Sequence, residues 1–361
     1  MIKTLKNDIS TVFVDTQYHF NEKFWPKTGA YIRSGVIENH KDTGVDPFMR
    51  SYPALIDIGI MAHCQNAALC PVDCYQNRYK GENNMSLEDF KSIIDQIKDK
   101  VMQVALGGAG SPNEHENFKE IVEYARENGV VPNYTTSGIG LTDEMVQITK
   151  KYAGAVAVSD YGQDYTYKAI KMFTDAGVKT NLHFVLGEDS IDRAIEYLKN
   201  TPEWLSKINA IIFLLYKPVG LGNRRNMLKY DNPKLKEFFE LVEQPHKFKI
   251  GFDSCTVPAI LNFTDKIDKN SIDTCEAGRF SCYITHDMKM IPCSFDNQDM
   301  RYAVDLRNHT IQEAWNSKEF DDFRMHFANS CNGCSEKRTC FGGCPLRREI
   351  VLCERPEKDL Q

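Results

Sequence analysis

Twelve cysteines dominate this sequence, and most of them lie at close spacing in two short regions. In the densest region, near the C-terminus, two, five and three residues separate four successive cysteines, and a fifth follows. Cysteines that served only as small buried hydrophobic residues would be scattered along the chain. In a chain without a secretion signal, clustered cysteines more often bind metal than form disulfides. The C-terminal run consists of Cys331, Cys334, Cys340 and Cys344, followed by Cys353.

The composition is that of a globular protein large enough for one barrel-sized domain and an additional small one. Of the 361 residues, 42% are hydrophobic and 26% charged, and the net charge is −6. This acidic balance argues against general nucleic-acid binding, which needs a basic surface. No stretch approaches the roughly 20 apolar residues of a membrane span, and the polar N-terminus lacks the apolar centre of a signal peptide. We therefore expect a cytoplasmic protein without membrane or nucleic-acid partners.

Residues 55–255 alternate short apolar runs, beginning with Leu55–Met61 and Val101–Leu106, with amphipathic stretches. Continuous apolar runs suit strands that are buried on both faces. Between the runs, Ser86–Asp99 opens with a capping-box variant, and Glu114–Asn128 ends before a glycine. This alternation predicts parallel strands with crossover helices, and about six repeats fit a partial (β/α) barrel with its reactive groups at the carboxyl ends of the strands. The remaining runs are Val130–Thr135, Ala155–Ser159, Thr180–Leu186, Ala210–Tyr216 and Phe248–Phe252.

The two ends of the chain lack this alternation. Residues 1–54 are weakly patterned, and we expect them to cover one end of the barrel. After residue 255 the cysteines become dense, and Ile311–Phe327 is the one clear helix. The sequence thus predicts an α/β fold: an N-terminal capping segment over 1–54, a partial barrel over 55–255, and a small irregular metal-stapled domain over 256–361.

The first cysteine group, Cys64, Cys70 and Cys74, directly follows the first predicted strand. Three thiolates on one loop hold three irons of a cubane iron–sulfur cluster and leave the fourth iron open. An alternative alignment starts at Cys70 and places Asn77 in the third position, although asparagine is a poor iron ligand. A tetrahedral zinc site is a second alternative, with His63 as the nearest fourth ligand.

Three later strands end in turns that are rich in glycine and serine. The second predicted strand ends at Gly107, Gly108 and Ala109, the third is followed by Ser137, and the fourth ends at Ser159. Each turn alone is a weak signal, because such turns occur in any α/β protein. Their order on successive strands is more informative, since the carboxyl ends of parallel strands meet at one end of a barrel.

Together, these features resemble the radical S-adenosylmethionine (SAM) enzymes that carry a C-terminal SPASM-type domain. In that family, three cysteines after the first strand hold a [4Fe–4S] cluster whose open iron chelates SAM. The family's usual spacing is C-x3-C-x2-C, whereas five and three residues separate the cysteines of this loop. The resemblance implies that Gly107, Gly108 and Ala109 approach SAM through their backbone and that Ser137 and Ser159 also line its site. The glutamate of the family's corresponding turn is missing, so only the backbone role carries over.

The C-terminal run from Cys331 to Cys353 matches the spacing of the SPASM pattern at every cysteine. The resemblance implies two auxiliary [4Fe–4S] clusters with no open iron, and three clusters in all. The usual glycine five residues before Cys293 is Met288 here. A pair of zinc ribbons is the alternative, although the five- and three-residue spacings fit ribbons poorly. The implied ligands are Cys275, Cys282, Cys293 and Cys344 for the first auxiliary cluster and Cys331, Cys334, Cys340 and Cys353 for the second.

Cys255 is the cysteine that remains after this assignment. It follows the last predicted barrel strand, where reactive groups lie in such barrels. It is therefore either a hydrogen-atom donor to a substrate radical, as in radical SAM epimerases, or a buried structural thiol. Asp253 and His183 present the same choice between a base and a structural role.

The resemblance implies an enzyme that cleaves SAM reductively to a 5′-deoxyadenosyl radical and abstracts hydrogen from a substrate carbon. Family members mostly oxidise, crosslink or epimerise peptides and proteins, and they take electrons from a donor such as flavodoxin or ferredoxin. The 54 residues before the first strand are fewer than the roughly hundred of a leader-recognition domain, which favours a small molecule, sugar or nucleoside as the alternative substrate. A zinc-binding module and an iron–sulfur electron carrier are the non-catalytic alternatives.

Overall fold

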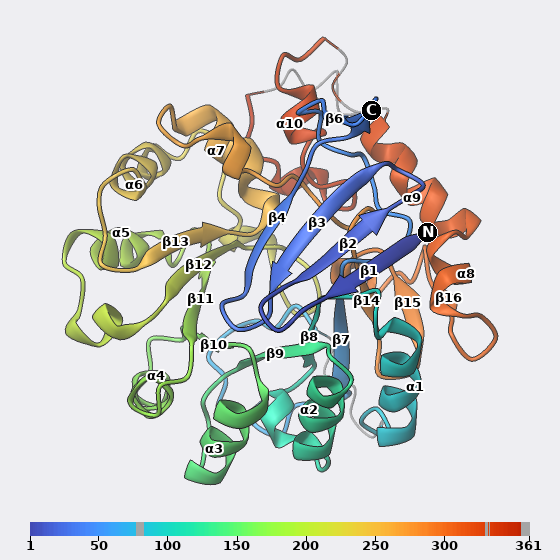
Figure 1. Ribbon diagram of the computed structural model, residues 1–361. Helices are drawn as coiled ribbons and strands as arrows, with labels where there is room; N and C mark the ends of the chain where they lie inside the picture. Colours follow the sequence, from blue (N-terminus) through green and yellow to red (C-terminus); the bar gives the residue numbers. More distant parts are fainter. Residues whose placement is uncertain (77–82, 329–330, 332, 355–361) are drawn as a thin grey trace.

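The computed structural model describes residues 1–76, 83–328, 331 and 333–354, and a curved sheet of parallel strands forms its centre (Figure 1). Successive strands of the barrel are neighbours in the sheet and pair in parallel, from β7 at one side to β13 at the other. This arrangement confirms the predicted α/β class and partial barrel. The strands are β7 (Leu55–Met61), β8 (Gln103–Gly108), β9 (Val131–Thr136), β10 (Val156–Ser159), β11 (Thr180–Leu186), β12 (Ala210–Leu215) and β13 (Lys249–Phe252).

Helices cover the outer face of this sheet (Figure 1). The first of them buries its apolar side, including Phe90 and Ile94, and the Ser86 side chain accepts a hydrogen bond from the backbone of Asp89, as the capping pattern predicts. The second begins only at Phe118, because a short 3-10 turn occupies the residues where the sequence predicts its start. The helices are α1 (Leu87–Ile97), α2 (Phe118–Glu127), α3 (Asp143–Tyr152), α4 (Asp164–Asp175), α5 (Ile191–Lys199) and α6 (Pro233–Val242).

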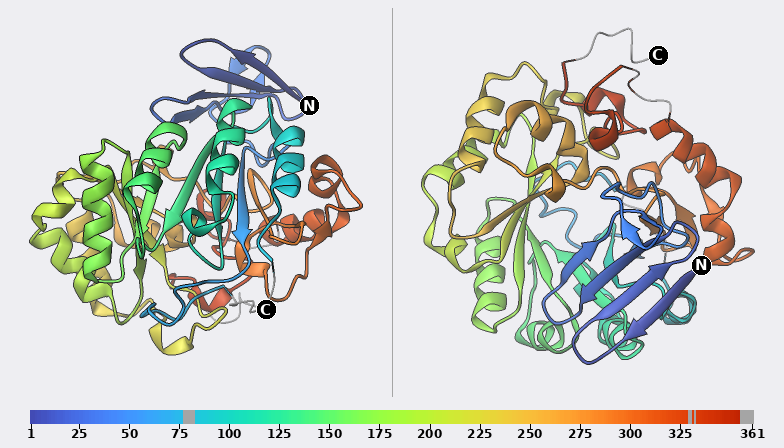
Figure 2. Two further views of the ribbon diagram at one scale, coloured as in Figure 1. Left: turned by 90° about the horizontal axis from the view of Figure 1, so that it is seen from below. Right: turned by 45° about the horizontal axis from the view of Figure 1, so that its top comes forward.

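An antiparallel four-stranded sheet at the N-terminus packs across one end of the barrel (Figure 2). Its Phe13 and Phe24 form a buried cluster with Ala54, Met102 and Val131, which lie at or just before the starts of β7, β8 and β9. The sheet therefore covers the amino ends of the barrel strands and leaves their carboxyl ends to the site. Its strands are β1 (Ile2–Lys6), β2 (Thr11–Asp15), β3 (Phe20–Trp25) and β4 (Ala30–Arg33), and a small hairpin of β5 (Ile37–Glu38) and β6 (Lys41–Asp42) follows.

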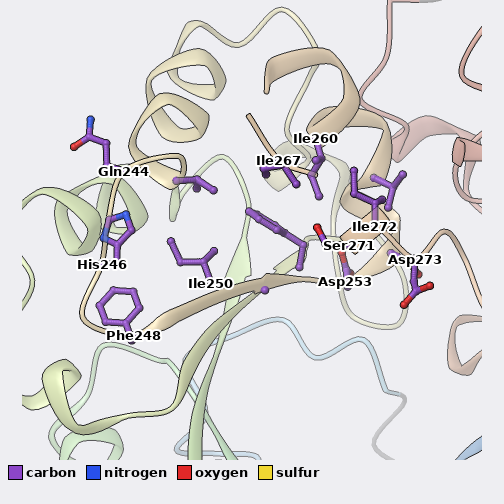
Figure 3. A pocket seen from close by; sticks show the side chains of 15 residues that line it. Gln244, His246, Phe248, Ile250, Asp253, Ile260, Ile267, Ser271, Ile272 and Asp273 are labelled. Atoms are coloured by element: carbon purple, nitrogen blue, oxygen red, sulfur yellow. The ribbon is translucent and has the colours of Figure 1, made fainter. Parts of the chain in front are cut away.

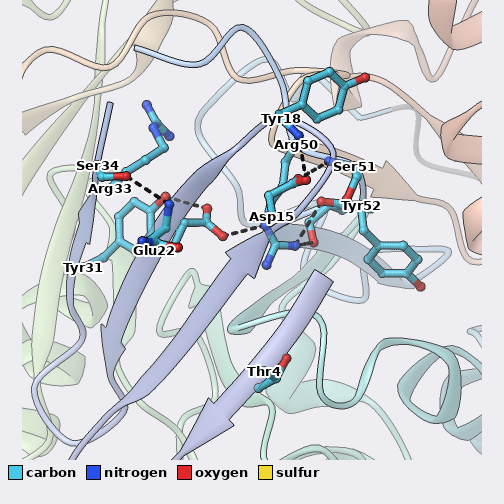
Figure 4. Close-up of polar contacts among 12 residues, drawn as sticks. Thr4, Asp15, Tyr18, Glu22, Tyr31, Arg33, Ser34, Arg50, Ser51 and Tyr52 are labelled. Carbon is cyan, nitrogen blue, oxygen red and sulfur yellow. Dashed lines mark hydrogen bonds and ion pairs between the residues drawn. The ribbon is translucent and has the colours of Figure 1, made fainter. Parts of the chain in front are cut away.

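A buried arginine joins this sheet to the rest of the protein (Figure 4). The Arg50 guanidinium donates to a Glu22 carboxylate oxygen at 2.6 Å and to the carbonyl oxygens of Tyr52 and Pro53. The backbone carbonyl of Arg50 accepts a hydrogen bond from the Trp315 indole at 2.9 Å. One residue thus links the N-terminal sheet, the first barrel strand and the C-terminal region.

The C-terminal region extends the barrel sheet instead of forming a separate one. Strand β14 pairs in parallel with β7, and β15 and β16 continue the same sheet as antiparallel strands. The prediction of one helix over Ile311–Phe327 is wrong, because the chain leaves helical geometry at Asn316 and a second helix follows. No helix in the described ranges is long and apolar enough to cross a membrane. The elements are α7 (Val257–Phe263), β14 (Ser281–Ile284), β15 (Lys289–Ile291), β16 (Val304–Asp305), α8 (Ile311–Trp315), α9 (Lys318–Ala328) and α10 (Lys337–Cys340).

Candidate functional site

The loop after β7 carries Cys64, Cys70 and Cys74, and the turn after β8 packs directly against it. A Cβ added to Gly110 would lie 2.6 Å from the His63 carbonyl oxygen and 3.4 Å from the Cα atom of Cys64. Only a glycine fits between these backbones without displacing one of them. The turn after the second predicted strand, which is β8, is therefore in contact with the first cysteine of the loop. The alternative ligand Asn77 lies outside the described residues.

The two glycines at the end of β8 differ in their surroundings. Gly108 has a φ of +117°, and a Cβ there would lie 2.3 Å from the Met61 carbonyl oxygen. The next residue, Ala109, donates its backbone N–H to that same oxygen at 2.8 Å. A Cβ on Gly107 would meet no atom within 4 Å. The turn is thus held tightly at Gly108, while the Gly107 backbone borders open space that a ligand can occupy.

Hydrogen bonds tie the serine-bearing strand ends into the same region. The Ser111 and Ser137 hydroxyls lie 3.1 Å apart, and the Ser137 N–H donates to the Ser111 hydroxyl. At the end of β10, the Ser159 side chain interacts with the Tyr161 phenol, which lies within electrostatic reach of Cys70, and burial raises the pKa of that phenol. Tyr161 and Ser111 were not predicted from the sequence, because nothing in their local pattern distinguishes them from other turn residues.

The loop after β12 closes over the cysteine loop from the opposite side of the barrel. The Leu221 N–H donates to the Cys74 carbonyl oxygen at 2.9 Å. Gly220 has a φ of +65°, and a Cβ there would lie 2.3 Å from the Tyr75 carbonyl oxygen. Backbone from the segments after β8 and β12 therefore packs against the first cysteine group, and Tyr161 after β10 lies within electrostatic reach of it. All three segments lie at the carboxyl ends of the strands, where barrel enzymes place their chemistry.

Two titratable side chains on barrel strands have strongly shifted pKa values. Burial raises the pKa of Asp57 on β7 to about 7. Burial lowers the pKa of His183 on β11 to about 4, and its ring lies 3.4 Å from the Thr135 hydroxyl. His183 is therefore a neutral imidazole at pH 7. Asp57 was missed in the sequence, although a lone carboxylate within the apolar run Leu55–Met61 was a visible signal.

A cavity of about 340 Å³ separates the barrel from the C-terminal region. Asp57 and Asp253 line it from the barrel, and Cys255, Cys275 and Cys293 line it from the loops beyond. At its edge the Lys217 ammonium pairs with Asp253 at 2.5 Å, and only 3% of the lysine side chain is exposed. The cavity thus combines carboxylates, thiols and a buried cation next to the barrel interior, which is the kind of setting where catalytic groups gather.

A second cavity, of about 370 Å³, follows the outer edge of β13 (Figure 3). Ile250, Ile260 and Ile272 make much of its wall apolar, and Asp253 and Ser254 belong to both cavities. Because β13 is the last strand of the sheet order, this cavity lies beside an unpaired strand edge. No cysteine lines it, so it is distinct from the thiol-rich cavity.

The C-terminal cysteines lie in tight turns around α10. The Cys334 N–H donates to the Cys331 carbonyl oxygen at 3.3 Å, and the Cys340 N–H donates to the Glu336 carbonyl oxygen at 2.8 Å. All twelve cysteines of the chain are thiols and none is in a disulfide. Within the described part of the chain, no three His, Cys, Asp or Glu side chains converge on a single metal ion. Ligands of a cubane bind different iron atoms and need not converge on one point.

Comparisons with known proteins agree with this architecture. The SPASM family model, described as an iron–sulfur cluster-binding domain, matches residues 275–335. The chain is 22% identical to the AdoMet-dependent heme synthase of Nitratidesulfovibrio vulgaris over 77% of this chain and 83% of that protein. It is 24% identical to the mycofactocin maturase MftC of Mycolicibacterium smegmatis over 76% of this chain and 74% of that one. This protein is a radical SAM enzyme with a C-terminal SPASM domain.

A solved structure shares the fold of this radical SAM enzyme across most of its length. Streptococcus suis SuiB bound to its precursor peptide SuiA superposes with a TM-score of 0.67, at 18% identity, over 87% of this chain and 77% of that chain. The predicted family, its SAM dependence and its iron–sulfur chemistry are thus confirmed, whereas the assignment of individual ligands remains a prediction.

Proposed function

We propose that this enzyme cleaves SAM at the Cys64, Cys70 and Cys74 loop and uses the resulting radical to abstract hydrogen from a peptide or protein substrate. The observation that carries the SAM site is the packing of backbone after β8 and β12 against that loop, together with the position of Tyr161 after β10. A [4Fe–4S] cluster held by the three thiolates supplies an open iron for SAM and the electron that cleaves it.

The residues around the loop suit SAM. The open backbone at Gly107 offers polar groups to the amino group of SAM, and the tight contact of Gly108 with Met61 fixes their direction. Ser137 and Ser159 bring hydroxyls from the next two strands. These groups are positioned by strand ends rather than by long flexible loops, so that little order is lost when the ligand binds.

A peptide is the substrate class that the relatives favour. SuiB was solved with a precursor peptide bound, and mycofactocin maturase is a maturase by name. In this chain, the cavity of about 340 Å³ beside Asp57 is large enough for a substrate side chain. Asp57, with its pKa near 7, can accept a proton from a substrate held there. A small molecule is the second candidate, because the heme synthase relative is also matched over most of its length.

We also propose three [4Fe–4S] clusters and an external electron donor such as flavodoxin or ferredoxin. Two are auxiliary clusters of the SPASM domain. Cys331, Cys334 and Cys340 lie in the turns around α10 and, together with Cys353, are the candidate ligands of one of these clusters. Cys275, Cys293 and Cys344 are candidate ligands of the other. For its fourth ligand the sequence predicts Cys282, and it predicts Cys255 as a hydrogen-atom donor.

SAM cleavage tests the proposal directly. The anaerobically reconstituted full chain, reduced with dithionite in the presence of SAM, is expected to release 5′-deoxyadenosine. The variant with Cys64→Ala, Cys70→Ala and Cys74→Ala is expected to release none, whereas the loop control Gln65→Ala, at an exposed position, keeps the activity of the wild type. Cleavage by the triple variant would show that the site lies elsewhere.

Isotope transfer separates the two substrate classes. A pool of perdeuterated peptides is expected to place deuterium in the released 5′-deoxyadenosine, as measured by its mass. A pool of perdeuterated sugars and nucleosides is expected to leave the mass unchanged. Deuterium from the second pool alone would favour the small-molecule alternative.

A further inference from the structure

The first auxiliary cluster needs a fourth thiolate, and the structure offers two candidates with different surroundings. Cys275, Cys293 and Cys344 occupy the SPASM positions, and Cys282 and Cys255 are the cysteines that remain. Because side chains alternate between the two faces of a strand, the neighbours of Cys282 on β14 show which face its thiol occupies.

Cys282 lies on the helix-covered face of the sheet. In the parallel ladder, Tyr283 pairs with Asp57 and Cys282 pairs with Ile56. A Cβ on Gly59 would lie 2.1 Å from the Tyr283 hydroxyl, so Tyr283 shares the face of Asp57 and Gly59, which is the cavity side. The Cys282 side chain, although its residue borders the cavity, therefore points to the other face with Ile56.

The neighbours of the Cys282 thiol agree with this direction. Besides Asp57, which is the next residue after its pairing partner Ile56, it lies within electrostatic reach of Arg324 and Tyr52. Tyr52 donates its hydroxyl to a backbone carbonyl of α1, and Arg324 of α9 binds the backbone carbonyl of Trp315. The pairing partner of Cys282, Ile56, is fully buried, and Cys282 itself is 2% exposed. It is placed as a core side chain rather than as a ligand.

Cys255 lies among the other three thiols instead. Its thiol interacts with that of Cys344. It lines the same cavity as Cys275 and Cys293, and the Cys293 thiol lies within electrostatic reach of both. Cys255 thus lies near Cys275, Cys293 and Cys344, which come from three other segments of the chain.

A buried cation stands beside this set. The Lys217 ammonium lies within electrostatic reach of Cys255 and Cys344 while it pairs with Asp253. Thiolates that leave water need a compensating positive charge or metal. The position of Lys217 therefore favours an anionic group at Cys255 and Cys344. A cluster held by thiolates is such an anionic group.

We propose that Cys255, and not Cys282, is the fourth thiolate of the first auxiliary cluster, which this cysteine attaches to the end of the last barrel strand. The inference rests on the auxiliary cluster proposed above. It revises two sequence predictions together, because it leaves Cys282 in the core and leaves Cys255 unavailable as a hydrogen-atom donor.

The test compares Cys255→Ala with Cys282→Val in the anaerobically reconstituted full chain. Iron, sulfide and the low-temperature EPR spectrum of the reduced protein are measured without SAM. The wild type is expected to hold about twelve irons. Cys255→Ala is expected either to lose about four of them or to keep a cluster whose EPR signal shifts on addition of cyanide, because one iron has lost its thiolate. The cyanide comparison is made with each change added to the Cys64→Ala, Cys70→Ala and Cys74→Ala variant, which lacks the cluster whose open iron would itself bind cyanide. Cys344→Ala is the positive control and is expected to behave in the same way.

Cys282→Val keeps an apolar side chain in the core and is expected to retain the iron content and EPR spectrum of the wild type. The inference is overturned if Cys255→Ala keeps the wild-type iron content and a cyanide-insensitive spectrum, or if folded Cys282→Val loses iron. Cys255→Ser preserves volume should the alanine variant not fold, and altered EPR g values support ligation whereas unchanged values overturn it. Wild-type protein without iron would instead contradict the proposed function.

Discussion

The ammonium of Lys217 lies 2.5 Å from a carboxylate oxygen of Asp253, although the two residues follow different strands, β12 and β13. The lysine side chain is 3% exposed and the aspartate side chain 19%. Removing one partner of a buried pair leaves an uncompensated charge, which costs about 3–5 kcal/mol. Breaking this pair will therefore destabilise the junction between the barrel and the SPASM domain.

We expect Lys217→Met to lower the thermal midpoint strongly and Lys217→Met combined with Asp253→Leu to lower it less than the two single changes predict together. The control is Lys199→Met, which breaks a pair with Glu237 that is about half exposed on both sides and costs about 1 kcal/mol or less. Equal losses for Lys217→Met and Lys199→Met would show that the buried pair contributes no more than a surface pair.

The Arg50–Glu22 contact carries a second prediction, on the N-terminal sheet. Both side chains are almost fully buried, with 0% and 1% exposure. Arg50→Met leaves the Glu22 carboxylate without its cation and is expected to cost about 3–5 kcal/mol. Because the guanidinium also binds two carbonyl groups before β7, the sheet will loosen from the barrel.

Limited proteolysis measures this loosening. Arg50→Met is expected to expose cleavage sites within residues 1–54 that the wild type protects. Lys6 of the same sheet makes an exposed pair with Asp99, which follows α1. Lys6→Met removes this pair and is expected to leave the pattern unchanged. A wild-type pattern for Arg50→Met would show that apolar packing of Phe13 and Phe24 alone holds the sheet in place.

The barrel and its helices were predictable because their signals are local. Apolar runs such as Leu55–Met61 and the cap at Ser86 each lie within a few residues, and the structure confirms them. The N-terminal sheet was missed because its strands are short and their residue types do not follow their burial: in Thr11–Asp15, polar residues are buried at both ends while two valines are half-exposed. The extension of the barrel sheet by β14 depends on pairing across the whole chain, which no local pattern records.

The same distinction applies to the site. The cysteine groups and the glycine turn are local motifs, and the sequence identified them. The direction in which Cys282 points depends on its register with Ile56, and the partners of Cys255 come from three other segments of the chain. Spacing alone assigns a cysteine to a motif, but only strand pairing decides which face of the sheet receives its thiol.

Substitutions at the two glycines at the end of β8 test two different properties, the stability of the fold at Gly108 and contact with a ligand at Gly107. Gly108→Ala forces a Cβ to within 2.3 Å of the Met61 carbonyl oxygen at a φ of +117°, so it is expected to lower the thermal midpoint. Gly107→Ala places its Cβ where no atom lies within 4 Å and is expected to leave stability close to that of the wild type. If SAM occupies that space, Gly107→Ala weakens SAM binding about tenfold or more, as measured by equilibrium dialysis. Unchanged SAM affinity in Gly107→Ala would place the cofactor elsewhere.

Asp57 gives the protein a distinctive dependence of stability on pH. Burial raises its pKa from the ordinary 3.8 to about 7. Between these values the native state keeps a proton that the unfolded chain has released, so the free energy of unfolding falls as the pH rises from about 4 to about 7. Above pH 7 this decrease in the free energy of unfolding levels off, and it amounts to at most about 4 kcal/mol.

Asp57→Asn removes this titration. Relative to the wild type, its thermal midpoint is expected to rise steadily between pH 5 and pH 8. The upper limit lies about one pH unit above the raised pKa of Asp57, where nearly all of the carboxyl groups have ionised. Asp231→Asn, at an exposed position, controls for the loss of one negative charge and is expected to follow the wild type at every pH. Parallel curves for Asp57→Asn and the wild type would mean that the Asp57 carboxylate ionises in the folded protein as readily as in the unfolded chain, and that the cavity beside it is filled with water.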